Sequence, residues 1–229
     1  MSLGLTLQNS RELFALMSKD DLHDAQVLVL APLFPSINQP WMDTYLEQLQ
    51  RSGIQFCVLS NIKIATNYHD KVDRLELRRR VITVSMDTQT VLVSSVSAMV
   101  LQPAKTWRWL RRTWYRLLEP KLKTRIGSLL RALHAARRIH AFEQLKLIHV
   151  HSLSMGYEFL PAAWGRRLPM VITFHGLEPS GVPQIPAHQR QALFDYATRV
   201  LVNTHFARRH AMALGCPGDK ITIIPQGLP

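Results

Sequence analysis

The stretch Leu147-Ile-His-Val-His151 and the segment Met170-Val-Ile-Thr-Phe-His-Gly176 are short, β-branched runs separated by residues with helical spacing. Two more such runs follow, Val200-Leu-Val-Asn203 and Ile221-Thr-Ile-Ile-Pro-Gln-Gly227. Short buried strands that alternate with crossover helices are typical of parallel, doubly wound sheets. The sequence therefore predicts an α/β fold with a mostly parallel sheet and helices on both faces.

The first part of the chain extends this pattern. Residues 26–31 are a continuous apolar run, as expected for a strand that is buried on both faces. A helix is predicted over 41–51, ended by Ser52-Gly53, and a second strand over 54–59. This β-loop-α-β order is Rossmann-like. Further elements are predicted as a helix at 9–23, a strand at 80–84, a helix preferred over a strand at 88–102, and apolar helical stripes at 107–117 and 122–133.

Polar side chains stand where these strands end. His151, His175, Gly176 and Asn203 each follow a predicted strand. Parallel strands present their carboxyl ends at one edge of the sheet, and ligands bind there, so we expect these residues to form the site. Asn203-Thr204 also fits a helix N-cap. We expect His149 and His151 on opposite faces of their strand, and hence no shared metal ion.

Basic residues are concentrated in one segment. The net charge is +12, and eleven basic residues against one acidic residue between Leu101 and Phe142 give +10 of it. Three interpretations stay open: a solvated face over packed tryptophans, binding to nucleic acid, or docking on an anionic membrane. In the membrane interpretation the contacts come from Trp107, Arg108, Trp109, Arg111, Arg112, Trp114 and Arg116.

Composition narrows the setting of the protein. Two cysteines in unrelated segments and a charged N-terminal region do not fit a disulfide framework or a secretory signal. No apolar run approaches the roughly 20 residues that cross a bilayer. We expect a cytoplasmic protein, which docks peripherally on the inner face of the plasma membrane if the basic segment binds lipid.

The runs from Ile148 to Gly227, in their order, resemble the N-terminal domain of retaining, family 4-like glycosyltransferases of the GT-B type, where they read "IHAH", "TFHG" and "VIPNGVD". The resemblance implies transfer of a hexose from a nucleotide-sugar to a lipid-linked or polysaccharide acceptor, as in bacterial cell-surface glycan synthesis. Because many acceptors of such enzymes are lipid-linked, it also favours an anionic membrane over nucleic acid as the partner of the basic segment. It implies that His175 contacts the transferred sugar or the leaving phosphate. It also implies acceptor contacts from His151, Gly156, Gly176 and Asn203, with no cofactor or metal beyond the nucleotide-sugar substrate.

The chain also departs from this family pattern. Gln39-Pro40 stands where many members carry a Gly-Gly pair, and the spaced glutamate pair of the donor-binding domain has no counterpart. We therefore expect one acceptor-binding domain over 1–229, an interdomain linker that starts at 222–229, and a donor domain outside this chain. Alone, it should have little transferase activity. A non-catalytic subunit that pairs with a separate donor domain, or a nucleic-acid-binding protein, are the alternatives.

Overall fold

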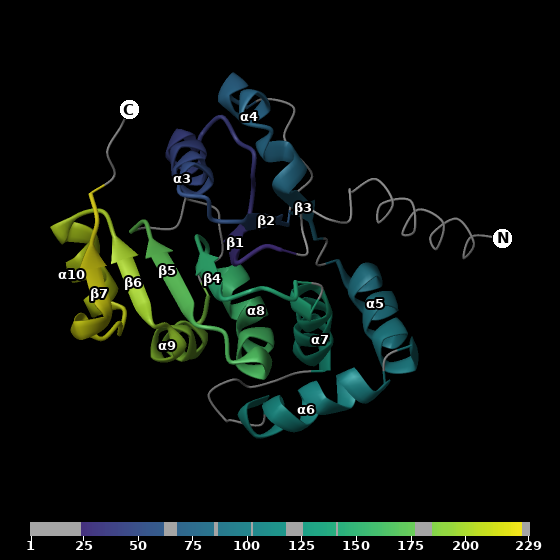
Figure 1. Cartoon of the computed structure of the whole chain (residues 1–229). Helices are drawn as coiled ribbons and strands as arrows, with labels where there is room; N and C mark the ends of the chain where they lie inside the picture. The colour runs from purple at the N-terminus through teal and green to yellow at the C-terminus, as the bar shows by residue number, and fades with distance from the viewer. Residues whose placement is uncertain are drawn as a thin grey trace.

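The computed structural model describes residues 24–61, 68–84, 87–101, 103–117, 126–140, 142–176 and 185–225. Over these residues seven strands form one sheet in the order β3-β2-β1-β4-β5-β6-β7, and every neighbouring pair is parallel. Helices lie on both faces (Figure 1). The predicted doubly wound, Rossmann-like α/β fold is confirmed.

The strands are short and mostly buried. They span Val27–Ala31 (β1), Phe56–Ser60 (β2), Val81–Thr83 (β3), Leu147–Val150 (β4), Met170–Phe174 (β5), Arg199–Val202 (β6) and Ile221–Ile223 (β7). Every residue of β1 and β2 is buried, because helices cover both faces of the sheet there. The chain order reverses between β1 and β4, which are direct neighbours in the sheet.

Alternation along the strands divides the core into two layers. In β1, Leu28 and Leu30 belong to the larger layer, whereas Val29 between them belongs to the smaller one. Ile148 of β4 and Ile172 of β5 also belong to the larger layer. Helix α3 (Pro40–Arg51), the short α4 (Asp70–Arg74) and the 3-10 turn η1 (Leu77–Arg80) cover the smaller layer. Helices α7 (Ile126–His140), α8 (Leu153–Arg166), α9 (Ala187–Tyr196) and α10 (His205–Ala213) contribute to the larger layer.

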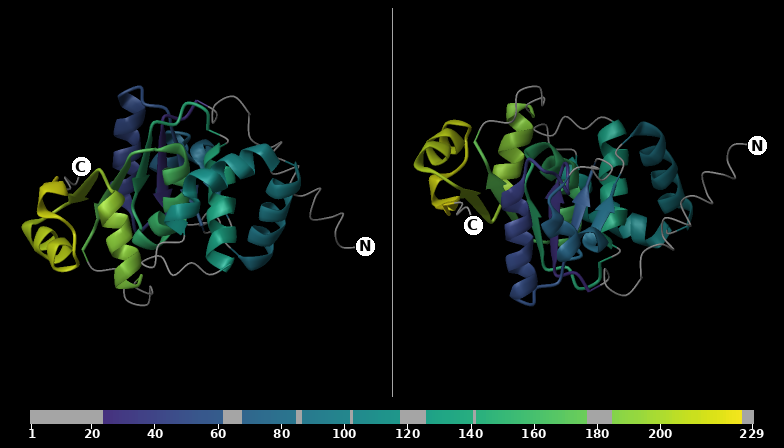
Figure 2. Two further views of the ribbon diagram at one scale, coloured as in Figure 1. Left: turned by 90° about the horizontal axis from the view of Figure 1, so that it is seen from below. Right: turned by 90° about the horizontal axis from the view of Figure 1, so that it is seen from above.

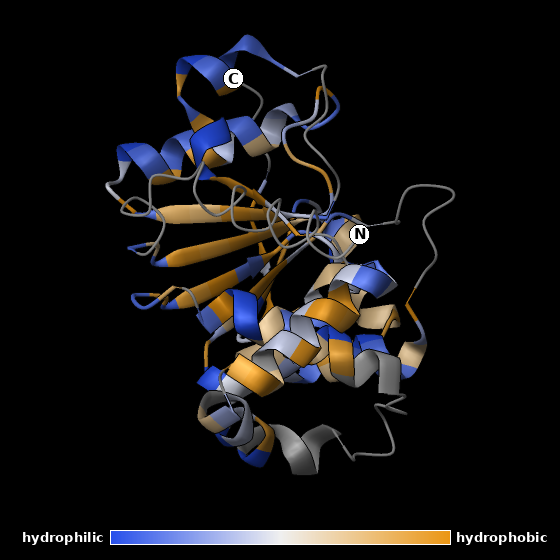
Figure 3. Ribbon diagram, turned by 90° about the vertical axis from the view of Figure 1, so that its right-hand side faces the viewer, coloured by the Kyte–Doolittle hydropathy of each residue, from blue (hydrophilic) through white to orange (hydrophobic). Residues whose placement is uncertain are grey.

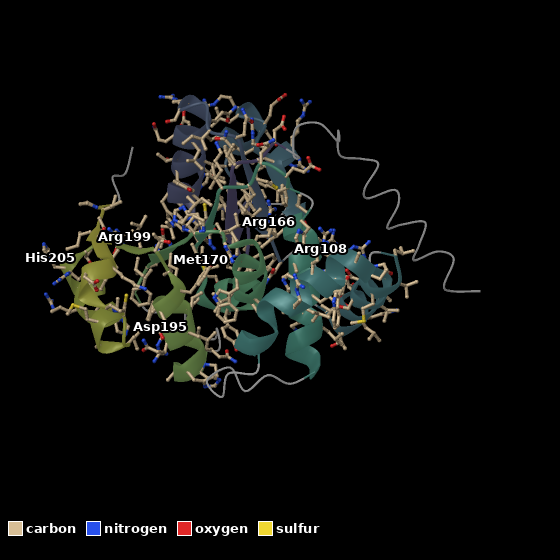
Figure 4. All side chains as sticks on the ribbon, turned by 60° about the horizontal axis from the view of Figure 1, so that its bottom comes forward. Arg108, Arg166, Met170, Asp195, Arg199 and His205 are labelled. Atoms are coloured by element: carbon tan, nitrogen blue, oxygen red, sulfur yellow. The ribbon has the colours of Figure 1, made fainter. Side chains whose placement is uncertain are left out.

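Helices α5 (Thr88–Leu101), α6 (Pro103–Leu117) and α7 form a group at one end of the molecule. Figure 2 shows this group, in teal, opposite the end that carries α10 and β7 in yellow. The guanidinium of Arg166, labelled in Figure 4, donates hydrogen bonds of 2.7 and 2.6 Å to the carbonyls of Ile139 and Phe142. A cation thus satisfies carbonyls at the end of α7 and ties this helix to α8.

Most predicted elements are present within a few residues. The helix preferred over a strand at 88–102 is α5, and the apolar stripe at 107–117 lies on α6. The second stripe lies on α7 from Ile126 onward, and its first residues are outside the described ranges. The helix predicted at 9–23 lies outside the described residues. Thr222 and Ile223, assigned to a linker from the sequence, instead belong to β7 and pair with β6. The 3-10 turn η2 (Gly218–Lys220) leads directly into this strand.

Candidate functional site

The site lies at the carboxyl edge of β4 and β5, on the sheet face that α3 covers. His149 is in β4 and lies between Val29 and Val171 on the neighbouring strands. Side chains repeat every two residues along a strand. The same face therefore presents His151 just beyond β4, and Thr173 and His175 on and just beyond β5.

Helix α3 supplies the aromatic part of the site. Pro40 is at its start, where a missing N–H costs nothing. Met42 and Leu46 are fully buried in the smaller core layer and fix the rotation of the helix. Trp41 and Tyr45 are four residues apart, so they lie on one side of the helix, and both contact the imidazole rings of the site.

A chain of hydrogen bonds holds His149. Its Nδ1 is 2.6 Å from the Tyr45 hydroxyl, and its Nε2 is 2.7 Å from the Thr173 hydroxyl. Burial, together with the charge of His175, lowers the pKa of His149 to about 4. The ring is therefore neutral at neutral pH, with one donor and one acceptor nitrogen. One hydroxyl donates to it and the other accepts from it, which fixes the ring between helix and strand.

His151 and His175 lie against Trp41. The ring centroids of Trp41 and His175 are 4.4 Å apart, those of Trp41 and His151 are 5.2 Å apart, and the two imidazoles are separated by 5.8 Å. Neither ring nitrogen of His151 has a hydrogen-bond partner within the described residues. Burial lowers the pKa of His175, and burial with the neighbouring imidazoles lowers the pKa of His151 further.

This arrangement suits an uncharged, hydroxyl-rich ligand. The lowered pKa values keep the imidazoles neutral, so each ring can donate one hydrogen bond and accept another. The indole of Trp41 adds a flat apolar surface beside them. Such a combination of apolar surface and a few fixed polar groups is typical of small-molecule sites.

One expectation about the histidines was wrong. His149 and His151 were expected on opposite faces of β4, but their ring centroids are 4.3 Å apart. The physical reason is the two-residue period of a strand, which returns every second side chain to the same face. Within the described residues, no group of three His, Cys, Asp or Glu side chains could hold a metal ion.

The other predicted site residues have different surroundings. Gly176 follows His175 with φ +101°, a backbone conformation that favours glycine. Gly156 is buried in α8, and a Cβ added there would meet Val150 and Leu193. Tight packing is enough to explain a glycine at this position, and its acceptor contact stays a prediction.

Asn203 follows β6, one strand beyond β5, and is half-buried. Its acceptor contact stays a prediction. The adjacent Thr204 has the capping role considered for this pair, because its hydroxyl accepts a 3.0 Å hydrogen bond from the Ala207 amide at the start of α10.

The basic segment divides into exposed and buried side chains. Trp107, Arg108 and Arg111 are exposed on α6. Trp109 is 3% exposed and packs in the larger core layer, so its predicted membrane contact is corrected. The reason is the helical period, which turns neighbouring positions to different sides. The side chains of Arg112, Trp114 and Arg116 lie outside the described set.

Sequence reasoning missed Trp41, Tyr45 and Thr173 as members of the site. The available signal was the spacing of Trp41 and Tyr45 on the helix that follows the first strand, directly after Pro40. That spacing placed them on one side of α3 but did not say that this side meets β4. Thr173 could have been predicted from the alternation along β5 alone, because it lies two residues before His175 and therefore on the same face.

The model of the Glycosyltransferase Family 4 matches residues 42–229. The chain belongs to glycosyltransferase family 4. The resemblance drawn from the strand motifs is thereby confirmed. No curated protein sequence matched this family 4 chain.

Solved structures share the fold of this family 4 chain at low identity. Anabaena HepE in complex with UDP and glucose is 13% identical with a TM-score of 0.55, over 89% of this chain and 45% of that one. A glycosyltransferase from Rickettsia africae is 15% identical with a TM-score of 0.52, over 88% and 43%. A UDP-N-acetylglucosamine 2-epimerase is 10% identical with a TM-score of 0.52, over 86% and 47%. The chain spans under half the length of these structures.

Replacing Tyr45 with phenylalanine tests the hydrogen-bond chain. The change removes the hydroxyl bonded to His149 Nδ1 and leaves a buried polar atom without that partner. We expect the free energy of unfolding to fall by about 1–3 kcal/mol, measured by urea denaturation at neutral pH.

Tyr68→Phe is the matched control. The Tyr68 hydroxyl makes its hydrogen bonds to Asp73 and Arg78 at the exposed surface, where water can replace them. Its loss should change the free energy of unfolding by less than about 0.5 kcal/mol. Equal losses of unfolding free energy in the two variants would show that the hydrogen bond to His149 contributes no more to stability than a surface hydrogen bond does.

Proposed function

We propose that this chain is the acceptor-side domain of a retaining glycosyltransferase. The reaction is transfer of a hexosyl group from a nucleotide-sugar to a lipid-linked or polysaccharide acceptor. Three observations support this: the match to glycosyltransferase family 4, the fold shared with a protein in complex with UDP-glucose, and the neutral imidazole pair beside Trp41 at the carboxyl edge of the sheet. The last of these carries the proposal.

His175 is the proposed catalytic residue. It follows β5 at the edge of the sheet and precedes Gly176, whose lack of a side chain lets a ligand approach the backbone. Burial lowers the pKa of His175, so at neutral pH it acts as a neutral hydrogen-bond donor rather than as a cation. A fixed donor directed at the sugar or the leaving phosphate stabilises charge that develops as the glycosidic bond breaks.

The neighbouring residues have binding and positioning roles in this proposal. His151 and Trp41 form the surface on which a sugar ring lies, and Asn203 approaches from the next strand. Tyr45 and Thr173 act through His149, which they hold in one orientation. The nucleotide is bound by a second lobe that faces this edge of the sheet, and the transfer needs both lobes.

Ligand binding to the chain alone tests the division of roles. We expect simple saccharides to perturb the NMR signals of the His151 and His175 rings with dissociation constants on the order of millimolar, because one lobe supplies only part of the contacts. UDP should cause no comparable change. Trp41→Ala should abolish the saccharide response, since it removes the flat surface beside both imidazoles.

Trp164→Phe is the control for Trp41→Ala. Trp164 is on α8 against Tyr196, away from the imidazole group, and its loss should leave saccharide binding as in the wild type. Two results would contradict the proposal: micromolar UDP binding by the chain alone, or normal rates of nucleotide-sugar turnover without a second lobe. If the NMR response to saccharides persists in Trp41→Ala, the saccharide binds at a different site.

A further inference from the structure

Helix α5 has its aliphatic side chains on the outside of the molecule. The exposed residues are Leu92, Val93, Val96, Met99, Val100 and Leu101, and Val100 and Leu101 are each 71% exposed. The helix carries no charged residue. Seen from the side of the molecule on which α5 lies, its ribbon shows extended orange, hydrophobic stretches (Figure 3). Contiguous exposed apolar surface of this kind marks an interaction site.

The inward side of α5 is less apolar than its outward side. Val91 and Ser95 are buried, and the Ser95 hydroxyl donates a 2.9 Å hydrogen bond to the Leu130 carbonyl on α7. Arg137 of α7 donates to the Ser94 carbonyl at 3.2 Å. These contacts fix the rotation of the helix, so the exposed stripe does not result from a loosely placed element. A helix on a water-exposed surface normally shows the opposite pattern.

Basic and aromatic side chains are exposed on α6, the next helix along the chain, which contacts α5. Trp107 is 68% exposed, and Arg108 and Arg111 are exposed beside it. Figure 4 labels Arg108 on the side of the molecule where α5 and α6 lie. The helix that follows the apolar stripe thus exposes tryptophan and arginine, within a segment whose local charge is strongly positive.

The positive charge and the apolar stripe together indicate which kind of partner this surface binds. A second copy, packed about a two-fold axis, would place the same arginines opposite one another. Nucleic acid would satisfy the arginines but would leave the valines, leucines and methionine uncovered. An anionic bilayer satisfies both parts, because acyl chains cover the aliphatic stripe and lipid phosphates pair with arginine.

We propose that α5 lies in the interface of an anionic membrane, with its Leu92–Val96–Val100 side in the acyl boundary. Trp107 then lies at the depth of the headgroups, which indole rings prefer, and Arg108 and Arg111 contact lipid phosphates. None of the helices in the described ranges is long and apolar enough to cross a bilayer. The inference does not depend on the proposed glycosyl transfer, and it makes α5 rather than α6 the main membrane contact.

Vesicle flotation tests the inference with the full chain. We expect wild-type protein to float with phosphatidylglycerol-containing vesicles at physiological salt and not with pure phosphatidylcholine vesicles. The double variant Val96→Ser/Val100→Ser should bind at least about tenfold more weakly, because it removes aliphatic groups that enter the acyl boundary. Arg108→Gln/Arg111→Gln should weaken binding and reduce its dependence on salt.

Matched controls separate the α5 surface from general hydrophobicity. Phe206→Ser and Met212→Ser remove exposed apolar side chains from α10, at the opposite end of the molecule, and should leave flotation unchanged. Brominated lipid should quench wild-type fluorescence more than that of Trp107→Phe. Circular dichroism of each variant confirms that the helices are retained.

Four results would overturn the proposal. They are absence of wild-type flotation with anionic vesicles, unchanged flotation of the α5 double variant, a wild-type dimer that this variant converts to a monomer without any vesicle binding, and oligonucleotide binding at physiological salt in place of vesicle binding. The third result would assign the surface to a second copy, and the fourth to nucleic acid.

Discussion

Lowering the pH from about 7.5 to about 5 is expected to destabilise the folded chain by several kcal/mol. The cause is a set of buried imidazoles. Burial lowers the pKa of His134 and of His149 to about 4, from the ordinary value of 6.5. It also lowers the pKa values of His151 and His175. Each lowered pKa means that the unfolded chain accepts a proton more readily than the folded one.

The sign of the effect follows from that difference. Above pH 6.5 these rings are neutral in both states, and their contribution to stability is fully present. Between pH 6.5 and about 4 the unfolded state binds more protons, so stability falls as pH falls. For His134 and His149 this amounts to about 2 kcal/mol each near pH 5. Burial raises the pKa of Asp43 to about 6 and also raises the pKa of Glu158. Both carboxyls oppose the trend, because their folded forms bind a proton more readily than the unfolded chain does. Two carboxyls do not offset the four imidazoles.

Thermal unfolding measured across this pH range tests the predicted loss of stability. The variant His134→Leu tests whether a buried imidazole causes it. His134 is fully buried in α7, and neither of its ring nitrogens has a hydrogen-bond partner within the described residues. The leucine variant should be at least as stable as wild type at about pH 7.5 and should lose about 2 kcal/mol less on acidification. His205→Gln, at an exposed position on α10, should behave as wild type. A pH response that His134→Leu leaves unchanged would argue against buried imidazoles as its source.

Replacing Gly156 with alanine is expected to lower the free energy of unfolding by about 1–3 kcal/mol. A Cβ at this position would be 2.7 Å from Val150 Cγ1 and 3.3 Å from Leu193 Cδ2. Both neighbours are fully buried, and the short, branched Val150 side chain has little room to move. The overlap should outweigh the gain of about 1 kcal/mol that alanine brings to a helix interior. Gly156→Val should be worse, because it adds two methyl groups to the same contact.

A double-mutant cycle isolates that overlap. Val150→Ala is destabilising by itself because it leaves a cavity, but it also removes the methyl group that the new Cβ would meet. The pair should therefore lose less stability than the sum of the single variants. Gly218→Ala is the control, since its added Cβ would be at an ordinary 3.4 Å from Met212 Cε. If the losses of unfolding free energy are additive in the cycle, α8 shifts away from β4 at little energetic cost, and the predicted overlap is absent.

The strand motifs were sufficient to predict the sheet and its place among known families. The apolar β-branched runs at 147–151 and 170–176 are local signals, since burial on both faces demands them wherever such strands form. The same runs placed His151 and His175 at the edge of the sheet. The sequence could not show that Trp41 and Tyr45 join them, because helix and strands are more than a hundred residues apart and meet only through packing.

What this amino-acid sequence determined by itself was the order of its strands and helices, the position of its histidines at strand ends and the concentration of charge between Leu101 and Phe142. Only the tertiary structure decided which sides of the elements meet. Helix α3 places two aromatic rings on the imidazoles, whereas α5 packs with Ser95 inward and Val96 outward. Periodicity reports which residues share a side, but which side is buried depends on the neighbouring surfaces available when the chain packs.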